Sequence, residues 1–360
     1  MIYLDYQATT PLAPEAFEAM VPWLRDHPAN PHSSHAPGRA AKAAVEVARD
    51  QVAALLPPGG RVVFTSGATE ALNWAIKGTN GPIVTVATEH AAVLDTVRAS
   101  GRPVTVLPVG SDGLVDVEAA RAAIVTGVGL VAAMLVNNEI GVIQPIADIA
   151  LMACSAGALM LVDAVQGYGR VEIPECCDII AISAHKIHGP KGIGALWVRD
   201  GISLEPLLHG GGQEALGRSG TLSPALCAGF GTAARLMPER AEPDRTHVAH
   251  LFGMARQRLG PGWQINGSTE HRYRGNLNIR RDGLDVARLM SDLRDIAFSA
   301  GSACASGSGR ASHVLQAMGL TDAQARSSIR LGFGRYTTQE ELMTAIDRIM
   351  AAATAQDSIT

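Results

Sequence analysis

The sequence predicts an α/β protein with a mostly parallel central sheet, helices on both faces of that sheet, and a smaller α+β C-terminal domain. Two observations predict this fold class. Before residue 238, short apolar runs alternate with longer segments of helical periodicity. At residues 238–244 the composition shifts to proline and charge, and a different order of helices and short strands follows. We therefore expect a large domain at residues 14–240 and a small domain formed by residues 1–13 and 241–360.

The helical segments carry apolar residues at spacings of three and four. The segment 40–56, for example, has them at positions 44, 45, 48, 52 and 55. The same reasoning predicts helices at residues 14–26 and 71–77, and an amphipathic helix near residues 339–353. Six short apolar runs are expected to be buried strands: residues 61–65, 83–87, 104–107, 130–136, 159–163 and 178–183.

The composition excludes several classes of protein. Hydrophobic residues make up 47% of the 360 residues, which is enough for a substantial core. The net charge of −4 disfavours a nucleic-acid-binding protein. The uncharged run 149–162 is shorter than the about 20 residues of a membrane span, and Gly157 divides it, so we expect a helix end followed by a strand. With no signal-peptide pattern at the N-terminus, the prediction is a cytoplasmic protein with no membrane partner.

The cysteines suggest neither disulfides nor a metal site. Their number is odd and none forms a CxxC pair, which argues against a disulfide framework and against zinc. We therefore expect a reducing compartment and no bound metal. The five are Cys154, Cys176, Cys177, Cys227 and Cys304.

Only four residues are lysines, namely Lys42, Lys77, Lys186 and Lys191, so elimination among them is possible. Lys42 and Lys77 lie in helical patterns and are expected at the surface. Lys186, in contrast, ends the run 178–186 and so emerges from the carboxyl end of an expected central strand, where ligands bind in open α/β sheets. A buried lysine is costly unless it is paired or covalently used. The residues alone leave open a structural or phosphate-contacting lysine and a lysine that forms a Schiff base.

A carboxylate and a helix N-terminus are expected near this lysine. Asp163 ends another expected strand and so lies at the same edge of the sheet. The two could form a buried ion pair, but pyridoxal phosphate chemistry needs the same pieces, a lysine for the imine and an acid for the ring nitrogen. The polar segment 65–70 opens a helix and could bind an anion, although it also fits an ordinary helix cap.

Beyond these pieces, the chain resembles the cysteine desulfurase family in an ordered series of motifs that spans residues 5 to 330. Members of this family are class V, fold-type I pyridoxal phosphate enzymes, so the resemblance implies that fold and that cofactor. The motifs are Asp5-Tyr-Gln-Ala-Thr-Thr-Pro11, Asn30-Pro-His-Ser-Ser-His35, Ser66-Gly-Ala-Thr-Glu70, Thr88-Glu-His90, Asn137-Asn-Glu-Ile-Gly141, Asp163-Ala-Val-Gln166, Ser183-Ala-His-Lys-Ile-His-Gly-Pro-Lys-Gly192, Gly210-Gly-Gly-Gln-Glu214, Arg218-Ser-Gly-Thr221, Ser302-Ala-Cys304 and Ser328-Ile-Arg330.

The resemblance implies a role for each residue around the cofactor ring. Lys186 would carry the cofactor as a Schiff base, and Asp163 would pair with the pyridinium nitrogen. Gln166 would hydrogen-bond the ring hydroxyl. His90 would stack on the ring and lie close to the proton that is transferred, where the alternative is a histidine of the core.

The resemblance also implies a phosphate site and a substrate site. Asn138 would lie beside the cofactor and the substrate, and Arg330 would clamp the substrate carboxylate, for which a guanidinium has the bidentate geometry. The phosphate would be held by Ala68, Thr69, Ser183 and His185, joined by Thr221 from the second subunit of a homodimer.

Cys304 is the expected nucleophile. Every side chain in residues 299–309 is small, whereas a structural cysteine usually has large apolar neighbours. A reactive thiol on a mobile loop therefore fits better than an incidental cysteine in a turn. The resemblance implies that L-cysteine is converted to L-alanine and a persulfide on Cys304, which is passed to a sulfur-acceptor or scaffold protein for iron–sulfur cluster or other thio-cofactor assembly.

Two alternatives remain open from the sequence. The chain could be a selenocysteine lyase or another class V lyase or aminotransferase, although transamination needs no thiol. It could also be a non-catalytic scaffold subunit that keeps only the fold, against which the complete set of site residues argues. Only residues 331–360 follow Arg330, a shorter end than in the iron–sulfur assembly members, so the identity of the acceptor is left open.

Overall fold

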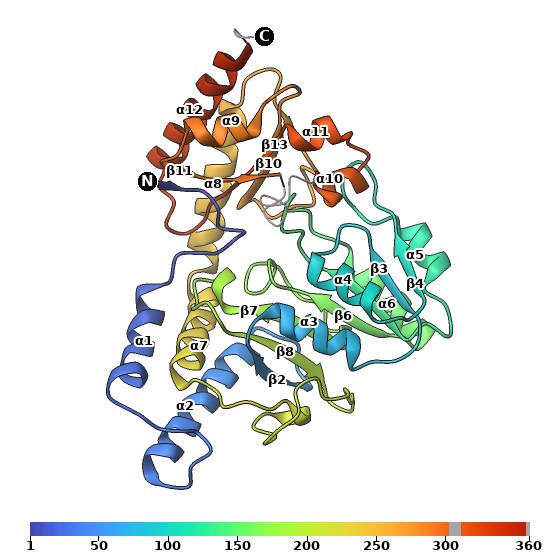
Figure 1. Ribbon diagram of the computed structural model, residues 1–360, viewed down its shortest axis with the longest axis vertical. Coiled ribbons are helices and arrows are strands. Elements are labelled where there is room, and N and C mark those ends of the chain that lie inside the picture. The colour runs from blue at the N-terminus through green and yellow to red at the C-terminus, as the bar shows by residue number, and fades with distance from the viewer. Residues whose placement is uncertain (302–310, 358–360) are drawn as a thin grey trace.

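The computed structural model describes residues 1–301 and 311–357, and its centre is a seven-stranded sheet (Figure 1). The order in the sheet is β2-β8-β7-β6-β5-β3-β4, and the five strands from β7 to β4 are parallel to one another. Only β8 runs antiparallel to both strands that flank it. The α/β fold class predicted from the sequence is confirmed. The strands are β2 (Gly60–Thr65), β3 (Ile83–Val86), β4 (Val104–Leu107), β5 (Leu130–Met134), β6 (Leu159–Asp163), β7 (Ile179–Ser183) and β8 (Gly194–Arg199).

Helices cover both faces of this sheet because successive side chains of a buried strand point to opposite faces. In β7, Ile180 and Ile182 pack into one hydrophobic cluster and Ile179 and Ala181 into another. The first cluster contains side chains of α1 (Pro14–Arg25), α2 (Ala36–Ala53), α5 (Val117–Ala123), α6 (Ile146–Ala156) and α7 (Pro224–Glu239), and the second contains side chains of α3 (Ala68–Lys77) and α4 (Ala91–Ala99).

A separate core lies in the C-terminal part of the chain, at the top of Figure 1. It joins a four-stranded antiparallel sheet of order β12-β13-β10-β9 to three helices, and Leu4 from the N-terminal segment is buried in it. We keep the division at residue 240 as a proposal. The elements are β1 (Ile2–Tyr3), α8 (Ala241–Arg258), β9 (Gln264–Ile265), β10 (Asn276–Arg280), α9 (Val286–Asp292), β11 (Ile296–Ala297), β12 (Ser299–Ala300), α10 (His313–Ala317), α11 (Asp322–Arg326), β13 (Ser328–Gly332) and α12 (Gln339–Asp357).

The expected elements and the observed ones differ most at α2, at β8 and at residues 238–244, and elsewhere the bounds differ by a few residues. Helix α2 begins at Ala36 rather than at residue 40, because the His35 side chain accepts the N–H of Gly38 (3.2 Å) and caps the helix. Strand β8 was not expected from the sequence, since its short apolar run follows a glycine-rich turn. The proline- and charge-rich segment 238–244 is helical except at Arg240, the one residue that separates the end of α7 from the start of α8.

The run 149–162 is a helix end followed by a strand, as predicted. Helix α6 ends at Ala156, and Gly157 adopts a left-handed conformation (φ 74°) that turns the chain into β6. Within residues 1–301 and 311–357, no helix is both long enough and apolar enough to cross a membrane.

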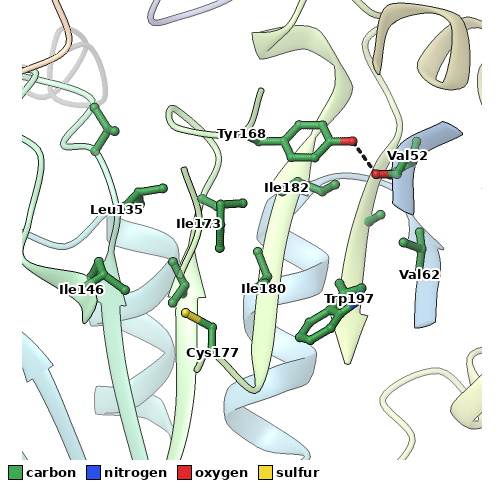
Figure 2. Packing of buried hydrophobic residues seen from close by; sticks show 14 of the residues in the cluster. Val52, Val62, Leu135, Ile146, Tyr168, Ile173, Cys177, Ile180, Ile182 and Trp197 are labelled. Carbon is green, nitrogen blue, oxygen red and sulfur yellow. Dashed lines mark hydrogen bonds between the residues drawn. The ribbon is translucent and has the colours of Figure 1, made fainter. Parts of the chain in front are cut away.

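Figure 2 shows a buried polar contact within the main hydrophobic core. Tyr168 is fully buried, and its hydroxyl donates a hydrogen bond to the carbonyl oxygen of Val52 (2.7 Å) near the end of α2. Burial raises the pKa of Tyr168 well above its usual value, so this hydroxyl stays a donor. The bond ties α2 to the loop that follows the Asp163 strand.

Replacing Tyr168 with phenylalanine should test that tie. The substitution keeps the ring but leaves the Val52 carbonyl without this donor, so we expect the free energy of unfolding to fall by about 1–2 kcal/mol. The measurement is urea unfolding followed by tryptophan fluorescence. The matched control is Tyr336→Phe at a partly exposed ring, which should change stability by less than about 0.5 kcal/mol. Equal effects of the two substitutions would contradict the role given to Tyr168.

Candidate active site

A cavity of about 660 Å³ lies at the carboxyl ends of the parallel strands. Asp163 and Ser183, the last residues of β6 and β7, line it. Thr221 is exposed and is not among the residues that line it, and Cys304 lies outside the described residues. The predicted residues that the structure brings together around this cavity are Ala68, Thr69, His90, Asn138, Asp163, Gln166, Ser183, His185, Lys186 and Arg330.

Lys186 enters the cavity from a short 3-10 turn, Ala184–Lys186, that follows β7. Its Nζ donates hydrogen bonds to the backbone carbonyl oxygens of Ala8 (2.8 Å) and Gln7 (2.5 Å). The N-terminal segment thus supplies acceptors for an ammonium group that would otherwise be costly to bury. Gln166 is fixed by the same segment, since its Nε2 donates to the Gln7 carbonyl oxygen (2.9 Å).

Asp163 is a buried carboxylate that would gain from a nearby cation. Its Oδ1 accepts the N–H of Val165 (3.0 Å). Burial raises the pKa of Asp163, whereas the Val165 hydrogen bond and the charges of His90 and Lys186 lower it. A protonated ring nitrogen placed against this carboxylate would favour its ionised form in the same way.

His90 caps helix α4 at the cavity wall. Its Nδ1 accepts the N–H of Ala92 (3.1 Å), which leaves the proton of the neutral ring on Nε2. Burial lowers the pKa of His90, so the neutral ring is the stable form. This flat, uncharged ring is suited to stacking against an aromatic ligand.

Glu89 is a buried acid beside this histidine that sequence reasoning did not single out. Its Oε1 accepts the N–H of Met134 (2.7 Å), and its Oε2 is buried with no hydrogen-bond partner among the described residues. Burial and the neighbouring Asp163 raise its pKa well above the usual value. Both effects disfavour the ionised form of the Glu89 carboxyl group, as expected beside a second acid in the same buried region.

The N-terminus of α3 lies at the wall of the cavity and is suited to an anion. Ala68 and Thr69 are its first residues. The loop before it is fixed by Glu70, which accepts the N–H of Ser66 (2.6 Å) and pairs with Arg218 (2.9 Å). The first residue of β8, Gly194, also packs closely against this loop. A Cβ at Gly194 would lie only 2.8 Å from the Cα of Gly67.

His185 lines the same cavity as a neutral side chain. Its Nδ1 lies 3.2 Å from Oγ1 of Thr9. Burial, and then the charges of Lys186 and Lys191, lower the pKa of His185 to about 4. At neutral pH the ring can therefore offer a hydrogen bond without adding charge.

Arg330 is held at the wall by residues that sequence reasoning gave no role. Its Nη2 donates to Oδ1 of Asp5 (2.6 Å) and to Oγ of Ser299 (3.1 Å), and its Nη1 donates to the Asn138 carbonyl oxygen (3.0 Å). Only 1% of the side chain is exposed, and Nε has no partner in the described part of the chain. The missed residues Asp5, Gln7 and Ala8 could have been found from one signal, a short motif with no helix or strand pattern.

These residues fit pyridoxal phosphate. The cavity offers an amine at the end of one strand, a buried carboxylate at the end of the next, a neutral aromatic ring, and a helix N-terminus for a phosphate. The unpartnered Nε of Arg330 adds a donor that a carboxylate of the substrate could use. Among the described residues, no cluster of histidine, cysteine and acidic side chains could hold a metal ion.

Comparison with known proteins agrees with this geometry. Residues 2–344 match the Aminotransferase class-V family. The chain belongs to this family. It is 43% identical over 368 residues to a cysteine desulfurase, IscS, of Rickettsia bellii, covering 97% of this chain and 90% of the relative. The resemblance to the cysteine desulfurases seen in the sequence is confirmed.

Two solved structures share the fold. A NifS-like protein from Rickettsia africae superposes with a TM-score of 0.91 at 31% identity, over 98% of this chain and 99% of that one. A protein described as SspA in complex with cysteine superposes with a TM-score of 0.83 at 33% identity, over 94% of this chain and all of that one (100%). Fold type and family therefore agree with the sequence-based expectation.

The histidines of this region predict a loss of stability in acid. Burial is the main cause that lowers the pKa of His188 to about 3, while an unfolded histidine takes up its proton near 6.5. Below pH 6.5 the unfolded state therefore binds more protons than the folded state. Each such histidine lowers the free energy of unfolding by about 1.4 kcal/mol per pH unit as the pH falls. His188 contributes down to about pH 3, and His185 adds to the effect down to about pH 4.

The measurement is unfolding by urea at several pH values between 6.5 and 4. We expect His188→Gln to reduce the slope of stability against pH by about 1.4 kcal/mol per unit, because the substituted side chain takes up no proton. The exposed His209→Gln is the control and should keep the wild-type slope. A wild-type slope in the His188 variant would show that this histidine is protonated in the folded protein.

Proposed function

We propose that the chain is a cysteine desulfurase that converts L-cysteine to L-alanine and a persulfide on Cys304, with pyridoxal phosphate in the 660 Å³ cavity. The observation that carries the proposal is that Lys186 and Asp163 line the same cavity, just beyond and at the carboxyl ends of two adjacent parallel strands. Relatives named cysteine desulfurase IscS, 42–43% identical over 97% of the chain, support the same activity.

Each residue around the cavity has a place in holding the cofactor. Lys186 would bind it through the Nζ amine, Asp163 would face the ring nitrogen, and Gln166 the ring hydroxyl. His90 would lie against the ring. Ala68 and Thr69 at the start of α3, with Ser183 and His185, would hold the phosphate. Once bound, the cofactor supplies an electron sink for the bonds at the α-carbon of the amino acid.

The chain's own residues then bind the substrate and move its proton. Arg330 would bind the substrate carboxylate, and Asn138 would lie beside it. Asp5 and Ser299 keep the guanidinium of Arg330 in place, because each accepts a hydrogen bond from Nη2. The Nζ of Lys186, which lines the cavity, would take the α-proton. For His90 to take it instead, its Nδ1 would have to release the N–H of Ala92, because Nε2 already carries the proton of the neutral ring.

Cys304 is the proposed nucleophile. None of the four described cysteines lines the cavity. Burial raises the pKa of Cys177 and of Cys227 to about 12, so neither forms a thiolate at neutral pH. In the net reaction the Cβ–Sγ bond of the substrate breaks, a sulfur–sulfur bond forms on Cys304, and the carbon takes up a proton to give L-alanine.

The proposal extends to the assembly of the protein. Thr221 does not line the cavity of its own chain, which is consistent with a role in the partner's phosphate site within a homodimer. The persulfide would pass to a sulfur-acceptor or scaffold protein. The free thiols of Cys154, Cys176, Cys177 and Cys227 support a reducing, cytoplasmic location.

Replacing the thiol tests the role of Cys304. Cys304→Ala should abolish sulfide release from L-cysteine while the absorbance of the bound cofactor stays unchanged, because only the sulfur acceptor is lost. The assay quantifies sulfide and alanine together. The control is Cys154→Ala at an exposed thiol, which should keep full activity. If desulfuration survives in the Cys304 variant, another group accepts the sulfur; preferential turnover of selenocysteine without the thiol would favour a lyase.

Chemical trapping tests the cofactor and its lysine. The purified protein should be yellow, and borohydride should fix the cofactor to Lys186, as peptide mass mapping would show. Lys186→Ala should carry no label, whereas the control Lys42→Ala, altered at an exposed residue, should be labelled like the wild type. A colourless protein that binds no pyridoxal phosphate would contradict the enzyme and favour a scaffold subunit.

A further inference from the structure

A second cavity, of about 340 Å³, adjoins the turn that carries Lys186. His188, two residues beyond that lysine, lines it, and helix α8 forms another wall. Its volume is in the range of small-ligand sites. It lies outside the set of residues that line the active-site cavity, since no residue lines both.

The side chains around this second cavity are strongly basic. Two acids, Asp244 and Glu270, also line it. His188 adds no charge at neutral pH, because burial lowers its pKa to about 3. The basic side chains that line the cavity are Arg170, Arg245, Arg272, Arg274 and Arg335.

Three of these arginines have no carboxylate partner in the described part of the chain. Arg335 pairs with Asp244 (2.7 Å), and Arg245 pairs with Glu242 at the surface (3.5 Å). The remaining three, Arg170, Arg272 and Arg274, form no ion pair there. The cavity wall therefore carries an excess of positive charge.

Arg272 is a buried arginine whose positive charge is not balanced by a carboxylate in the described part of the chain. Its Nη atoms donate only to backbone carbonyl oxygens, those of Ser268 (3.1 Å), Ile140 (3.0 Å) and Asn276 (3.0 Å). Its Nε is buried with no hydrogen-bond partner among the described residues, as is Nη1 of Arg335. Burial lowers the pKa of Arg272 to about 10, because no negative charge compensates it.

We propose that this cavity binds a small, multiply charged oxyanion of the phosphate or carboxylate class. Such a ligand supplies the negative charge that Arg272 and Arg274 lack, and guanidinium groups bind both kinds of oxyanion in bidentate fashion. The apolar side chains of Val248 and Ala249 on α8 limit the space, which favours a compact ligand.

Arg170 connects the occupant of this cavity to the active site. It lines the cavity, its Nη2 donates to the backbone carbonyl oxygen of Lys186, and its Nη1 donates to that of Gln166 (3.3 Å). Its guanidinium also lies over the ring of Tyr273, 5.2 Å from the centroid. An anion in the cavity competes with these carbonyls for Arg170, so its binding changes the environment of Lys186. This consequence, unlike the site itself, depends on the proposed function.

The test is calorimetric titration of the pyridoxal-phosphate-saturated protein with inorganic pyrophosphate and, separately, with citrate. Saturation keeps the cofactor's phosphate site filled, and the Arg274 variant distinguishes binding in the second cavity from binding of a carboxylate at Arg330. We expect one ion to bind per chain. Arg274→Gln should weaken the affinity at least about tenfold, because a charge-assisted contact is lost. The control is Arg98→Gln at an exposed arginine paired with Asp95, which should bind like the wild type.

A second variant protects the test against misfolding. Ala249→Trp fills the cavity from the partly exposed face of α8 and should also abolish binding, with a thermal midpoint close to that of the wild type. Binding of only one of the two ions would still support the site and would identify its chemical class. Binding of neither ion by the wild type, or unchanged binding in both variants, would overturn it.

The absorbance of the lysine-bound cofactor during the same titration tests the connection through Arg170. A spectral change in the wild type that is absent from Arg274→Gln at the same ion concentration supports it. Binding with no spectral change would overturn the connection but not the site. The heat of binding does not depend on turnover. The titration can therefore support or overturn the anion site whether or not the protein proves to be a desulfurase.

Discussion

The arrangement of the active site depends on one contact, the docking of the N-terminal segment against the turn that follows β7. The carbonyl oxygens of Gln7 and Ala8 accept hydrogen bonds from Nζ of Lys186, and Asp5 pairs with Arg330. A lysine and an arginine at a cavity wall would each carry a large desolvation cost without such partners. The N-terminal segment therefore stabilises two cationic side chains, Lys186 in the turn after β7 of the large sheet and Arg330 in β13 of the smaller sheet. Because it contacts both, it also fixes the distance between them.

This contact explains why the site needs both parts of the chain. Asp163 ends β6 and Lys186 lies in the turn that follows β7, whereas Arg330 lies in β13 and donates through Nη1 to the Asn138 carbonyl oxygen (3.0 Å). A ligand bound to Lys186 and Asp163 therefore lies in a cavity that Arg330 also lines. Burial raises the pKa of both acids near it. At Asp163 the Val165 hydrogen bond and the charge of Lys186 oppose this effect, whereas at Glu89 the neighbouring Asp163 adds to it.

Much of the fold and the site could be predicted because both follow from local patterns. Asp163 and Lys186 each end an apolar run, and parallel strands bring their carboxyl ends to one edge, so their proximity follows from the sequence. Strand β8 could not be found in this way, since its antiparallel place between β2 and β7 is a matter of long-range pairing. The roles of Asp5 and Gln7 were missed for a similar reason. Their partners are 325 and 159 residues away in sequence, and no periodicity reports such contacts.

The same turn also links the active site to the arginine-lined cavity. His188 has a left-handed backbone (φ 68°), which costs a residue with a Cβ about 1–2 kcal/mol. Its N–H donates to Oγ1 of Thr10 (2.7 Å), and its carbonyl oxygen accepts the N–H of Ala13 (2.9 Å). The N-terminal segment thus holds the strained residue in place, and this conformation lets the turn present Lys186 to one cavity and His188 to the other. A turn that is strained and held from outside responds to small changes at its contacts. Arg170, which binds the Lys186 carbonyl oxygen and lines the second cavity, is such a contact.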